Sequence, residues 1–307
     1  MQKLEVAVVL VDYQDSPYTQ ECLQSLDAQK VDGITIKTIV VFSQSSEARR
    51  KQFRKLFPHI ISIVLERNRG FSGSNNEALH HVLNKMKSEY ILLLNNDTRL
   101  ASDAINKLVS FAQLQKNPGI FSPKIFFEKG FEFHKNSYAE QEKGKAIWYA
   151  GGLVDKKNAY AWHRGVNEVD HGQFEDAQET SFATGCCMLI SREVLEKIGL
   201  LDDKFFLYLE DLDYSFRARN KKFHLWYVPS SIIWHKNAGS TGGSGSKTHI
   251  YYQTRNRLLF GFKHLSLRTK LALFKQLFQK KSYNTPIEKE ARFDFLFRRF
   301  GKRRKET

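Results

Sequence analysis

The sequence predicts an α/β fold, with a doubly wound and mostly parallel central sheet flanked by helices. Two observations predict this class. Short β-branched or aliphatic runs alternate with helical segments up to residue 130, and this alternation is typical of right-handed crossovers between parallel strands. One run, residues 90–100, stays apolar until it stops abruptly on amides, a carboxylate and a hydroxyl. A continuous apolar run bounded by polar residues predicts a central strand.

Composition divides the chain into two unlike parts. Its 307 residues, 41% hydrophobic, can bury the core of one large domain or two modest ones. The net charge of +15 is unevenly distributed along the chain. Up to Ser246 there are 31 Lys and Arg residues against 29 Asp and Glu residues, whereas from Lys247 onward there are 17 against 4. We therefore expect a catalytic domain over residues 1–253 and a basic, amphipathic helical extension over residues 254–307.

Cysteine usage and hydropathy predict a cytoplasmic protein. Three cysteines, two of them adjacent (Cys186 and Cys187), supply neither a disulfide framework nor the spaced ligands of a zinc site. The apolar run at the start of the chain is too short for a signal-peptide core. No segment approaches the roughly 18 apolar residues of a membrane span.

The first βα units follow from local signals. Residues 4–11 form a β-branched run, and a helix is expected after it with Ser16 as N-cap and Pro17 at its first position. Residues 34–42 and 60–65 predict the second and third strands, with a polar, basic helix between them.

A glycine-rich loop comes next, over residues 66–79, and opens another helix. Gly70 and Gly73 allow the backbone to approach a ligand closely, and Asn75 and Asn76 place amides near a helix N-terminus, where the dipole favours anions. Turn formation alone explains such residues about equally well.

Asp97 stands directly beyond the apolar run of residues 90–100. A carboxylate at the end of a central strand can hold a divalent cation, and such a cation neutralises a diphosphate. The alternative is that Asp97 caps the helix that starts near Ser102 or belongs to an ordinary turn.

The middle of the chain loses and then regains regular order. A helix over residues 101–115 and a strand over residues 119–127 precede an irregular aromatic stretch, residues 131–182, which either lines a binding surface or packs as a loop. A strand over residues 184–190 and a helix over residues 192–198 follow.

Three carboxylates open the next helix. Asp213 has a structural explanation, because it forms an i,i+4 pair with Arg217. That pairing leaves Glu210 and Asp211, and one of them is a candidate general base.

His235 ends a second apolar run that follows a strand over residues 224–228. A histidine there is more often hydrogen-bonded in the core than a metal ligand, so its sequence position alone favours the structural role.

Apolar residues recur at helical spacing in the basic tail, with lysines and arginines between them. They are Leu258, Phe262, Leu265, Leu267, Leu271, Phe274 and Phe278. Two interpretations remain open: helices packed on the catalytic domain, or docking on an anionic membrane surface, which the aromatic and cationic stretch at residues 293–305 favours.

The order of these motifs resembles the inverting, GT-A-fold glycosyltransferases of the rhamnosyltransferase-like family 2. The resemblance covers about residues 5–260. It rests on GFSGSNN, LLLNNDT, WYAGG, TGCCMLISREVLEKIGLLDDKFFLYLEDLDYSFRAR, IIWHK and YYQTRNRL, in that order.

The resemblance implies a role for each motif. Asp97 and His235 match the ligands of Mn²⁺ or Mg²⁺, and Asp211 matches the catalytic base. The positions matching the nucleotide-sugar donor site, for a UDP- or dTDP-sugar, are Asp12, Tyr13, Gly70, Phe71, Asn75, Asn76, Asn95 and Asn96. The positions matching the acceptor side are Trp148, Gly151, Thr184, Gly185 and Glu210. The implied acceptor is a glycan or lipid-linked molecule in cell-surface polysaccharide synthesis, at the inner face of the membrane.

The sequence departs from the family pattern at the nucleoside. Relatives usually place an aspartate after the second strand, where this chain has serines and glutamine over residues 43–46. Three explanations remain: Asp12 takes over that contact, the donor carries another nucleotide, or the chain is an impaired relative.

Two functions from other classes compete. A non-catalytic basic protein that binds nucleic acid would explain the tail but not a nearly neutral body with a carboxylate-rich site, and no nucleic-acid recognition motif is present. A sugar nucleotidyltransferase would use a cation, but it would be expected to carry a basic phosphate loop after the first strand, where residues 12–15 read DYQD.

Overall fold

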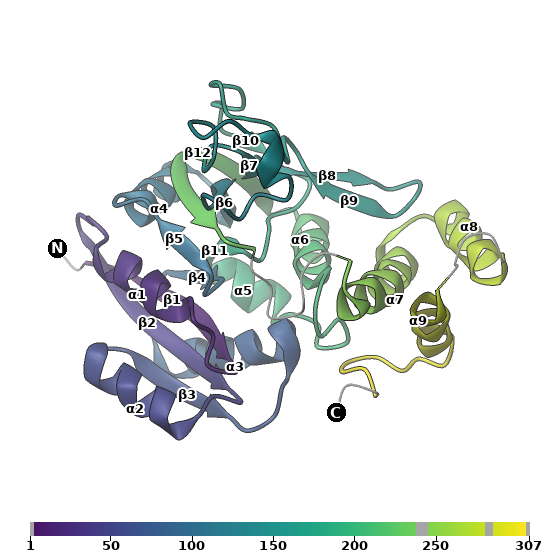
Figure 1. Cartoon of the computed structure of the whole chain (residues 1–307), viewed down its shortest axis with the longest axis horizontal. Helices are drawn as coiled ribbons and strands as arrows, with labels where there is room; N and C mark the ends of the chain where they lie inside the picture. The colour runs from purple at the N-terminus through teal and green to yellow at the C-terminus, as the bar shows by residue number, and fades with distance from the viewer. Residues whose placement is uncertain (1–2, 238–244, 280–284, 305–307) are drawn as a thin grey trace.

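A ten-stranded sheet forms the centre of the computed structural model, which describes residues 3–237, 245–279 and 285–304 (Figure 1). Its strands are β1 (Leu4–Tyr13), β2 (Ile34–Ser43), β3 (Ile61–Leu65), β4 (Tyr90–Leu94), β5 (Thr98–Leu100), β6 (Gly119–Phe127), β7 (Ile147–Tyr149), β10 (Gln178–Glu179), β11 (Cys187–Ser191) and β12 (His224–His235). The main path runs β10-β12-β6-β11-β4-β1-β2-β3, while β5 pairs with β12 and β7 with β6.

The predicted α/β class is confirmed. Strands β3, β2, β1 and β4 run parallel, as do β6 and β12, and β11 lies antiparallel between β4 and β6. Successive side chains of β1 alternate between two cores, with Val6, Val8 and Leu10 in one and Ala7 and Val9 in the other. That alternation of wholly apolar residues shows that both faces of the sheet are covered.

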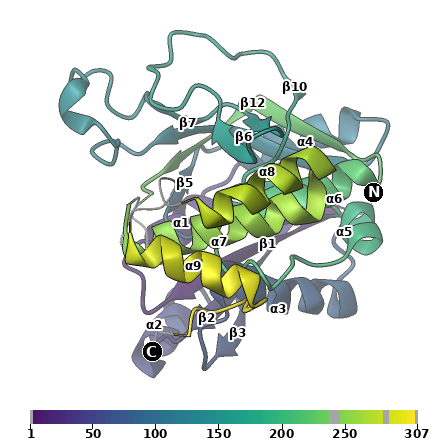
Figure 2. The same ribbon diagram turned by 90° about the vertical axis from the view of Figure 1, so that its right-hand side faces the viewer.

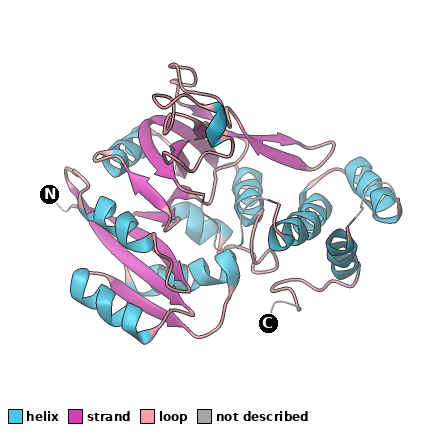
Figure 3. Ribbon diagram, in the orientation of Figure 1, coloured by secondary structure: helices cyan, strands magenta, loops and turns pink. Residues whose placement is uncertain are grey.

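Helices cover both faces, as Figure 3 shows by colour. Those of the first 220 residues are α1 (Thr19–Asp27), α2 (Glu47–Leu56), α3 (Gly70–Lys85), α4 (Ala104–Leu114), α5 (Arg192–Ile198) and α6 (Glu210–Asn220). Residues of α1, α2 and α4 join the first core, and residues of α3 and α5 join the second.

Local signals predicted many element bounds, but several differ. The apolar run of residues 90–100, expected as one strand, is divided into β4 and β5, and the strand expected over residues 184–190 is β11, which begins at Cys187. The expectation that Ser16 caps the first helix is wrong, because α1 begins only at Thr19 and the Ser16 hydroxyl instead accepts a hydrogen bond from the N–H of Tyr18. The two apolar runs expected over residues 224–235 form one strand, β12, whose register shifts between Val228 and Ile232.

The irregular stretch contains short strands. Besides β7 and β10 it holds a separate hairpin of β8 (Gly152–Asp155) and β9 (Tyr160–His163), which projects toward the C-terminal helices in Figure 1. The main chain of Trp148 and Ala150, at the end of β7, is tied to His163 and Arg164 at the end of this hairpin.

The tail forms α7 (Lys247–His264), α8 (Leu267–Phe278) and α9 (Pro286–Leu296). Figure 2 shows these three helices side by side on the face turned toward the viewer, with α7 between α8 and α9, and α7 also packs against α6. The expected boundary at residues 253 and 254 falls inside α7, whose Arg255 and Asn256 are completely buried. Helix α7 therefore packs as part of the body that contains the sheet.

No helix within the described ranges combines the length and the apolar character needed to cross a lipid bilayer.

Candidate functional site

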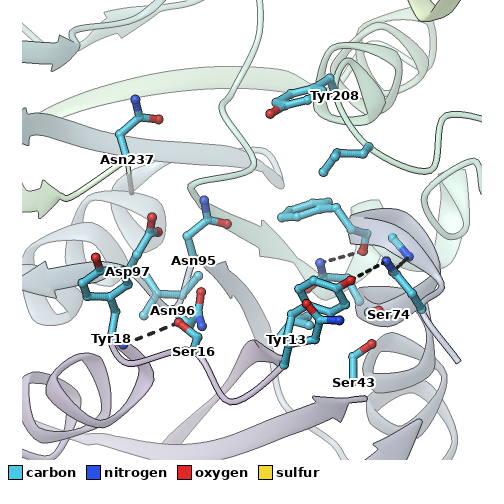
Figure 4. A pocket seen from close by; sticks show the side chains of 18 of the residues that line it. Tyr13, Ser16, Tyr18, Ser43, Ser74, Asn95, Asn96, Asp97, Tyr208 and Asn237 are labelled. Carbon is cyan, nitrogen blue, oxygen red and sulfur yellow. Dashed lines mark hydrogen bonds between the residues drawn. The ribbon is translucent and has the colours of Figure 1, made fainter. Parts of the chain in front are cut away.

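A cavity of about 520 Å³ opens where β1, β2 and β4 end (Figure 4). In open α/β sheets this edge is where ligands bind, because the loops after parallel strands diverge there. Eight of the residues predicted for the site line this one cavity: Tyr13, Gly70, Phe71, Asn75, Asn95, Asn96, Asp97 and His235.

Asp97 and His235 meet at one end of the cavity, although 137 positions separate them in the sequence. Strand β5, which begins one residue after Asp97, pairs antiparallel with the end of β12 and sets Thr98 opposite His235. The main-chain N–H of Lys236 also donates to the Asp97 carbonyl at 2.9 Å. As a result the Asp97 Oδ1 atom lies 3.0 Å from the His235 Nε2 atom, and both side chains are largely buried.

The pair fits a divalent cation. Two ligand atoms that bind one octahedral ion at about 2.1 Å each, at right angles, lie about 3.0 Å apart, which matches the observed separation. A carboxylate oxygen beside an imidazole nitrogen suits Mn²⁺ better than Mg²⁺, which prefers oxygen ligands throughout. No group of three or more metal-binding side chains occurs among the residues that the structure describes.

The imidazole of His235 is held from one side. The Trp148 ring packs edge-on against it, with the ring centroids 4.6 Å apart, and the buried Nδ1 atom has no hydrogen-bond partner within the described part of the chain. Trp148 in turn contacts His163, where burial lowers the pKa of the imidazole to about 4 and keeps it neutral. Trp148 therefore supports His235 and does not itself line the cavity. Sequence analysis did not single out His163.

The two ends of the cavity differ chemically. Figure 4 shows the Asp97 and Asn96 side chains near Tyr18 at one end, and Tyr13, Ser43 and Ser74 at the other. At the second end the Tyr13 hydroxyl accepts a hydrogen bond from the Asn68 amide at 3.2 Å. Both ends carry aromatic rings, hydroxyls and amides, but among the lining residues only the Asp97 end offers a carboxylate and an imidazole.

Gly70 is required by close packing at the start of α3. Its φ is +69°, and a Cβ atom there would lie 2.2 Å from the Phe206 carbonyl oxygen. This contact presses the start of α3 against residues 206–208, which form the opposite wall of the cavity. The side-chain amide of Asn75 donates to the Phe71 carbonyl at 2.9 Å within the same helix.

Two residues expected in the donor site lie elsewhere. The Asp12 carboxylate is fully buried beneath the cavity, where it accepts hydrogen bonds from Thr19 at 2.5 Å, from Ser45 at 2.9 Å and from Arg49 at 3.4 Å. The Asn76 amide points away from the cavity and bonds both the N–H and the carbonyl of Leu201. These two side chains join structural elements and do not line the cavity.

Asp211 lies beside the cavity, in the first turn of α6. Its Oδ2 atom accepts a hydrogen bond from the Gly185 N–H at 2.9 Å, and its Oδ1 atom accepts one from the Leu212 N–H at 2.8 Å. Burial raises the pKa of the Asp211 carboxyl, although these two hydrogen bonds oppose the rise. A Cβ atom at Gly185 would lie 3.0 Å from the Phe71 ring and 3.4 Å from the Asp211 Cβ atom, so Gly185 lies between Asp211 and the Phe71 ring that lines the cavity.

Glu210 differs from Asp211 in its surroundings. Its side chain is buried, and among the described residues its Oε2 atom has no hydrogen-bond partner. Burial, and then the charge of neighbouring Asp211, raise the pKa of Glu210 well above its usual range. Main-chain N–H groups orient both Asp211 oxygens beside the cavity, whereas the Glu210 side chain is enclosed, so Asp211 is the better candidate for the general base.

The remaining acceptor-side candidates differ in how close they lie to the site. The Thr184 side chain is buried and accepts a hydrogen bond from the N–H of Cys186 at 3.3 Å. Gly151 borders Arg164 and Thr180 and does not line the cavity. Only Gly185 and Trp148 of this group approach the Asp97 and Asp211 region.

Sequence analysis missed several residues that line the cavity. They are Ser43, Asn68, Ser74, Phe206, Leu207, Tyr208 and Asn237, together with residues 16–18. Ser43 and Asn237 follow or end long strands, which is a signal that sequence could have supplied. The segment 206–208 gives no such signal, because it reaches the cavity through a tertiary contact.

Helix α7 holds the segment 206–208 in place through hydrogen bonds to its main chain. The side-chain nitrogen of Asn256 lies 2.8 Å from each of the carbonyl oxygens of Phe205, Leu207 and Tyr208. Arg255 also donates to the Phe205 carbonyl, at 3.0 Å. The RN pair of YYQTRNRL thus fixes the main chain that leads from the cavity wall into Asp211.

Comparisons with known proteins identify the family of this chain. A family model described as "Glycosyltransferase like family 2" matches residues 3–261. The low-salt glycan biosynthesis hexosyltransferase Agl10 of Haloferax volcanii is 26% identical over 255 residues, which are 83% of this chain and 75% of that protein. The N-acetylglucosaminyl-diphospho-decaprenol L-rhamnosyltransferase of Mycobacterium tuberculosis is 21% identical over 246 residues, 76% of this chain and 77% of that protein.

Two solved structures share the fold. GalNAc-T7, solved with UDP, GalNAc and Mn²⁺, has a TM-score of 0.64 at 16% identity over 95% of this chain, which spans about half (54%) of that longer one. Mannosyltransferase PcManGT from Pyrobaculum calidifontis, solved with GDP-Man and Mn²⁺, has a TM-score of 0.55 at 14% identity, covering 93% of this chain and 73% of that one.

Proposed function

Because this chain belongs to glycosyltransferase family 2 and has the GT-A fold, we propose that it moves a sugar from a nucleotide-diphosphate donor to a hydroxyl of a glycan or lipid-linked acceptor. The reaction is metal-dependent and inverts the anomeric centre. The observation that carries the proposal is the Asp97 and His235 pair, 3.0 Å apart at the end of the 520 Å³ cavity. Membership of this family argues against the two competing functions, which were sugar nucleotidyltransferase and non-catalytic basic protein.

The donor lies along the cavity, with its diphosphate at the Asp97 end and its nucleoside at the Tyr13 end. Support comes from the distribution of charge-bearing groups, since the carboxylate and the imidazole of the lining stand together at one end and the Tyr13 end has neither. The solved neighbours hold Mn²⁺ with UDP or with GDP-Man. We propose a UDP- or dTDP-sugar for this chain, with Ser43 and Asn68 at the nucleoside in place of the buried Asp12.

Asp97 and His235 would hold Mn²⁺ or Mg²⁺, which supplies Lewis-acid stabilisation of the departing diphosphate. The protein holds the Asp97 and His235 side chains in position before the donor binds. The β5 and β12 pairing does so from the main chain, and the Trp148 ring orients the imidazole.

Asp211 accepts the proton of the attacking hydroxyl. An alcohol has a pKa far above neutrality, so a carboxylate must take its proton during the attack. The raised pKa of Asp211 suits that task, because a more basic carboxylate takes a proton more readily. One displacement with one base inverts the anomeric centre, and no second nucleophile is required.

The acceptor proposal draws on relatives and on the tail. The mycobacterial relative is named for a lipid-linked acceptor, N-acetylglucosaminyl-diphospho-decaprenol. In this chain the 17 basic against 4 acidic residues from Lys247 onward suit an anionic lipid surface. We therefore place the enzyme at the inner face of the membrane, on a lipid-linked acceptor of surface-polysaccharide synthesis.

Two substitutions test the assignments. Asp211→Asn should keep donor binding and lower turnover by about 10² to 10⁴, the range typical of a lost general base. Asp97→Ala should instead weaken Mn²⁺-dependent donor binding, measured by calorimetry with UDP- and dTDP-sugars. Glu193→Gln, an exposed first-turn acid of α5, is the matched control. Full transfer by Asp211→Asn would refute the base, and donor binding by Asp97→Ala that still responds to Mn²⁺ would refute the metal site.

A further inference from the structure

A second cavity, of about 350 Å³, lies at the C-terminal end of α9. Its walls come from Tyr251 of α7 and from the segment 294–304. Four cationic side chains line it: Arg298, Arg299, Lys302 and Arg304. It shares no lining residue with the cavity at the strand ends.

The acidic group in this cavity is already engaged. Asp294 is buried, accepts a hydrogen bond from the Tyr251 hydroxyl at 2.7 Å and lies 3.6 Å from Arg299. Within the described ranges, by contrast, no ion pair involves Arg298, Lys302 or Arg304. Cationic side chains gathered in a hollow without matching carboxylates create a positive potential that attracts an anion.

The rim of the cavity is apolar and exposed. Phe297 lines it while remaining 59% exposed, and Phe293 and Leu296 of the same turn of chain are 47% and 44% exposed. The neighbouring α8 exposes a further apolar stripe at the spacing of one helix face: Leu267, Leu271, Phe274 and Phe278. Figure 1 shows α8 and α9 at the same outer edge of the molecule, and Arg292 of α9 donates to the Gln276 carbonyl of α8 at 3.4 Å.

We propose that this cavity binds the phosphate of an anionic phospholipid headgroup while Phe293, Leu296 and Phe297 enter the lipid interface beside it. Arginine forks match phosphate oxygens, and aromatic rings favour the boundary between headgroups and acyl chains. A free phosphate would use the cationic groups but leaves the exposed apolar rim unexplained. The inference rests on the proposed membrane location and adds a specific headgroup site to it.

The test compares two triple variants that remove the same charge. Arg298→Gln with Lys302→Gln and Arg304→Gln removes three cations of the cavity. Arg54→Gln with Lys55→Gln and Lys116→Gln removes three exposed cations elsewhere. Full-length proteins are sedimented with phosphatidylcholine vesicles that contain or lack phosphatidylglycerol. Three basic residues near an anionic lipid surface strengthen binding by about 100-fold together.

The proposal expects the cavity variant to lose about 100-fold in affinity for the phosphatidylglycerol vesicles and the control variant to lose at most about threefold. Equal losses in both would overturn it, because they would indicate diffuse attraction only. Should the triple variant fail to fold by circular dichroism, Lys302→Gln alone should still weaken binding by about fivefold, and unchanged binding would overturn the site.

A second arm separates lipid from free phosphate. Phe297→Ser should weaken vesicle binding and leave thermal stabilisation by inorganic phosphate as it is in the parent protein. The opposite pattern, full vesicle binding with altered phosphate stabilisation, would overturn the lipid assignment. Neither readout depends on sugar transfer, so the headgroup site can fail while the proposed enzyme stands, and the reverse also holds.

Discussion

Asn256→Ala should show whether α7 holds the cavity wall in place. The fully buried Asn256 amide has two hydrogens, which three carbonyl oxygens share at 2.8 Å each, and its own oxygen accepts from Arg255 at 3.0 Å. Alanine removes the equivalent of two donated hydrogen bonds and leaves buried carbonyls without a partner. At about 0.5 to 1.5 kcal/mol per bond, with a further cost for each group left unsatisfied, the free energy of unfolding should fall by about 3 kcal/mol.

The same substitution should alter catalysis, because the segment that it releases is strained. Phe206, Tyr208 and Leu209 all have positive φ values, between 63° and 68°, and such conformations cost about 1 to 3 kcal/mol each in residues other than glycine. Without Asn256 the segment can relax, which moves the cavity wall and the start of α6 at Asp211. We expect a higher donor KM and a lower kcat even at temperatures where the variant is fully folded.

Urea unfolding measures the change in stability, and initial rates with varied donor separate KM from kcat. Asn84→Ala, at an exposed position of α3, is the matched control and should change neither. If Asn256→Ala loses stability yet keeps the parent KM and kcat, Asn256 stabilises the fold but does not position the cavity wall for catalysis. If the free energy of unfolding does not fall, the hydrogen bonds from Asn256 to residues 205–208 do not stabilise the fold.

Two further predictions concern the cavity and the base. Gly70→Ala should lower the melting temperature and abolish donor-induced thermal stabilisation, because φ is +69° and the new Cβ atom would lie 2.2 Å from the Phe206 carbonyl oxygen. Gly130→Ala is the control for backbone strain, because Gly130 has a φ of +84° but open space around it. Equal behaviour of the two variants would show that the close contact with Phe206 is not the cause. The raised pKa of Asp211 keeps this base protonated up to a higher pH than an ordinary aspartate, so kcat should fall on acidification with a midpoint above about 4. A midpoint at or below the ordinary value in the pH profile would contradict both the raised pKa and the role.

Local sequence patterns determined the elements of this protein. The apolar run before Asp97, the alternation of strands and helices, and the acidic first turn of α6 each lie within a short stretch, where propensity and periodicity act. Strand β6 and helix α5 have the bounds that the sequence predicts. The family motifs added the expectation that Asp97, His235 and Asp211 belong together.

Only the tertiary structure decided which side chains face the cavity. His235 reaches Asp97 because β5 pairs with β12, and that pairing joins segments more than 130 residues apart. Asp12 turns into the core and Asn76 turns to Leu201, although both stand in motifs that suggested a ligand. The physical reason is that a side chain's direction at the end of a strand or helix depends on the register and packing of distant segments, which short-range patterns do not encode.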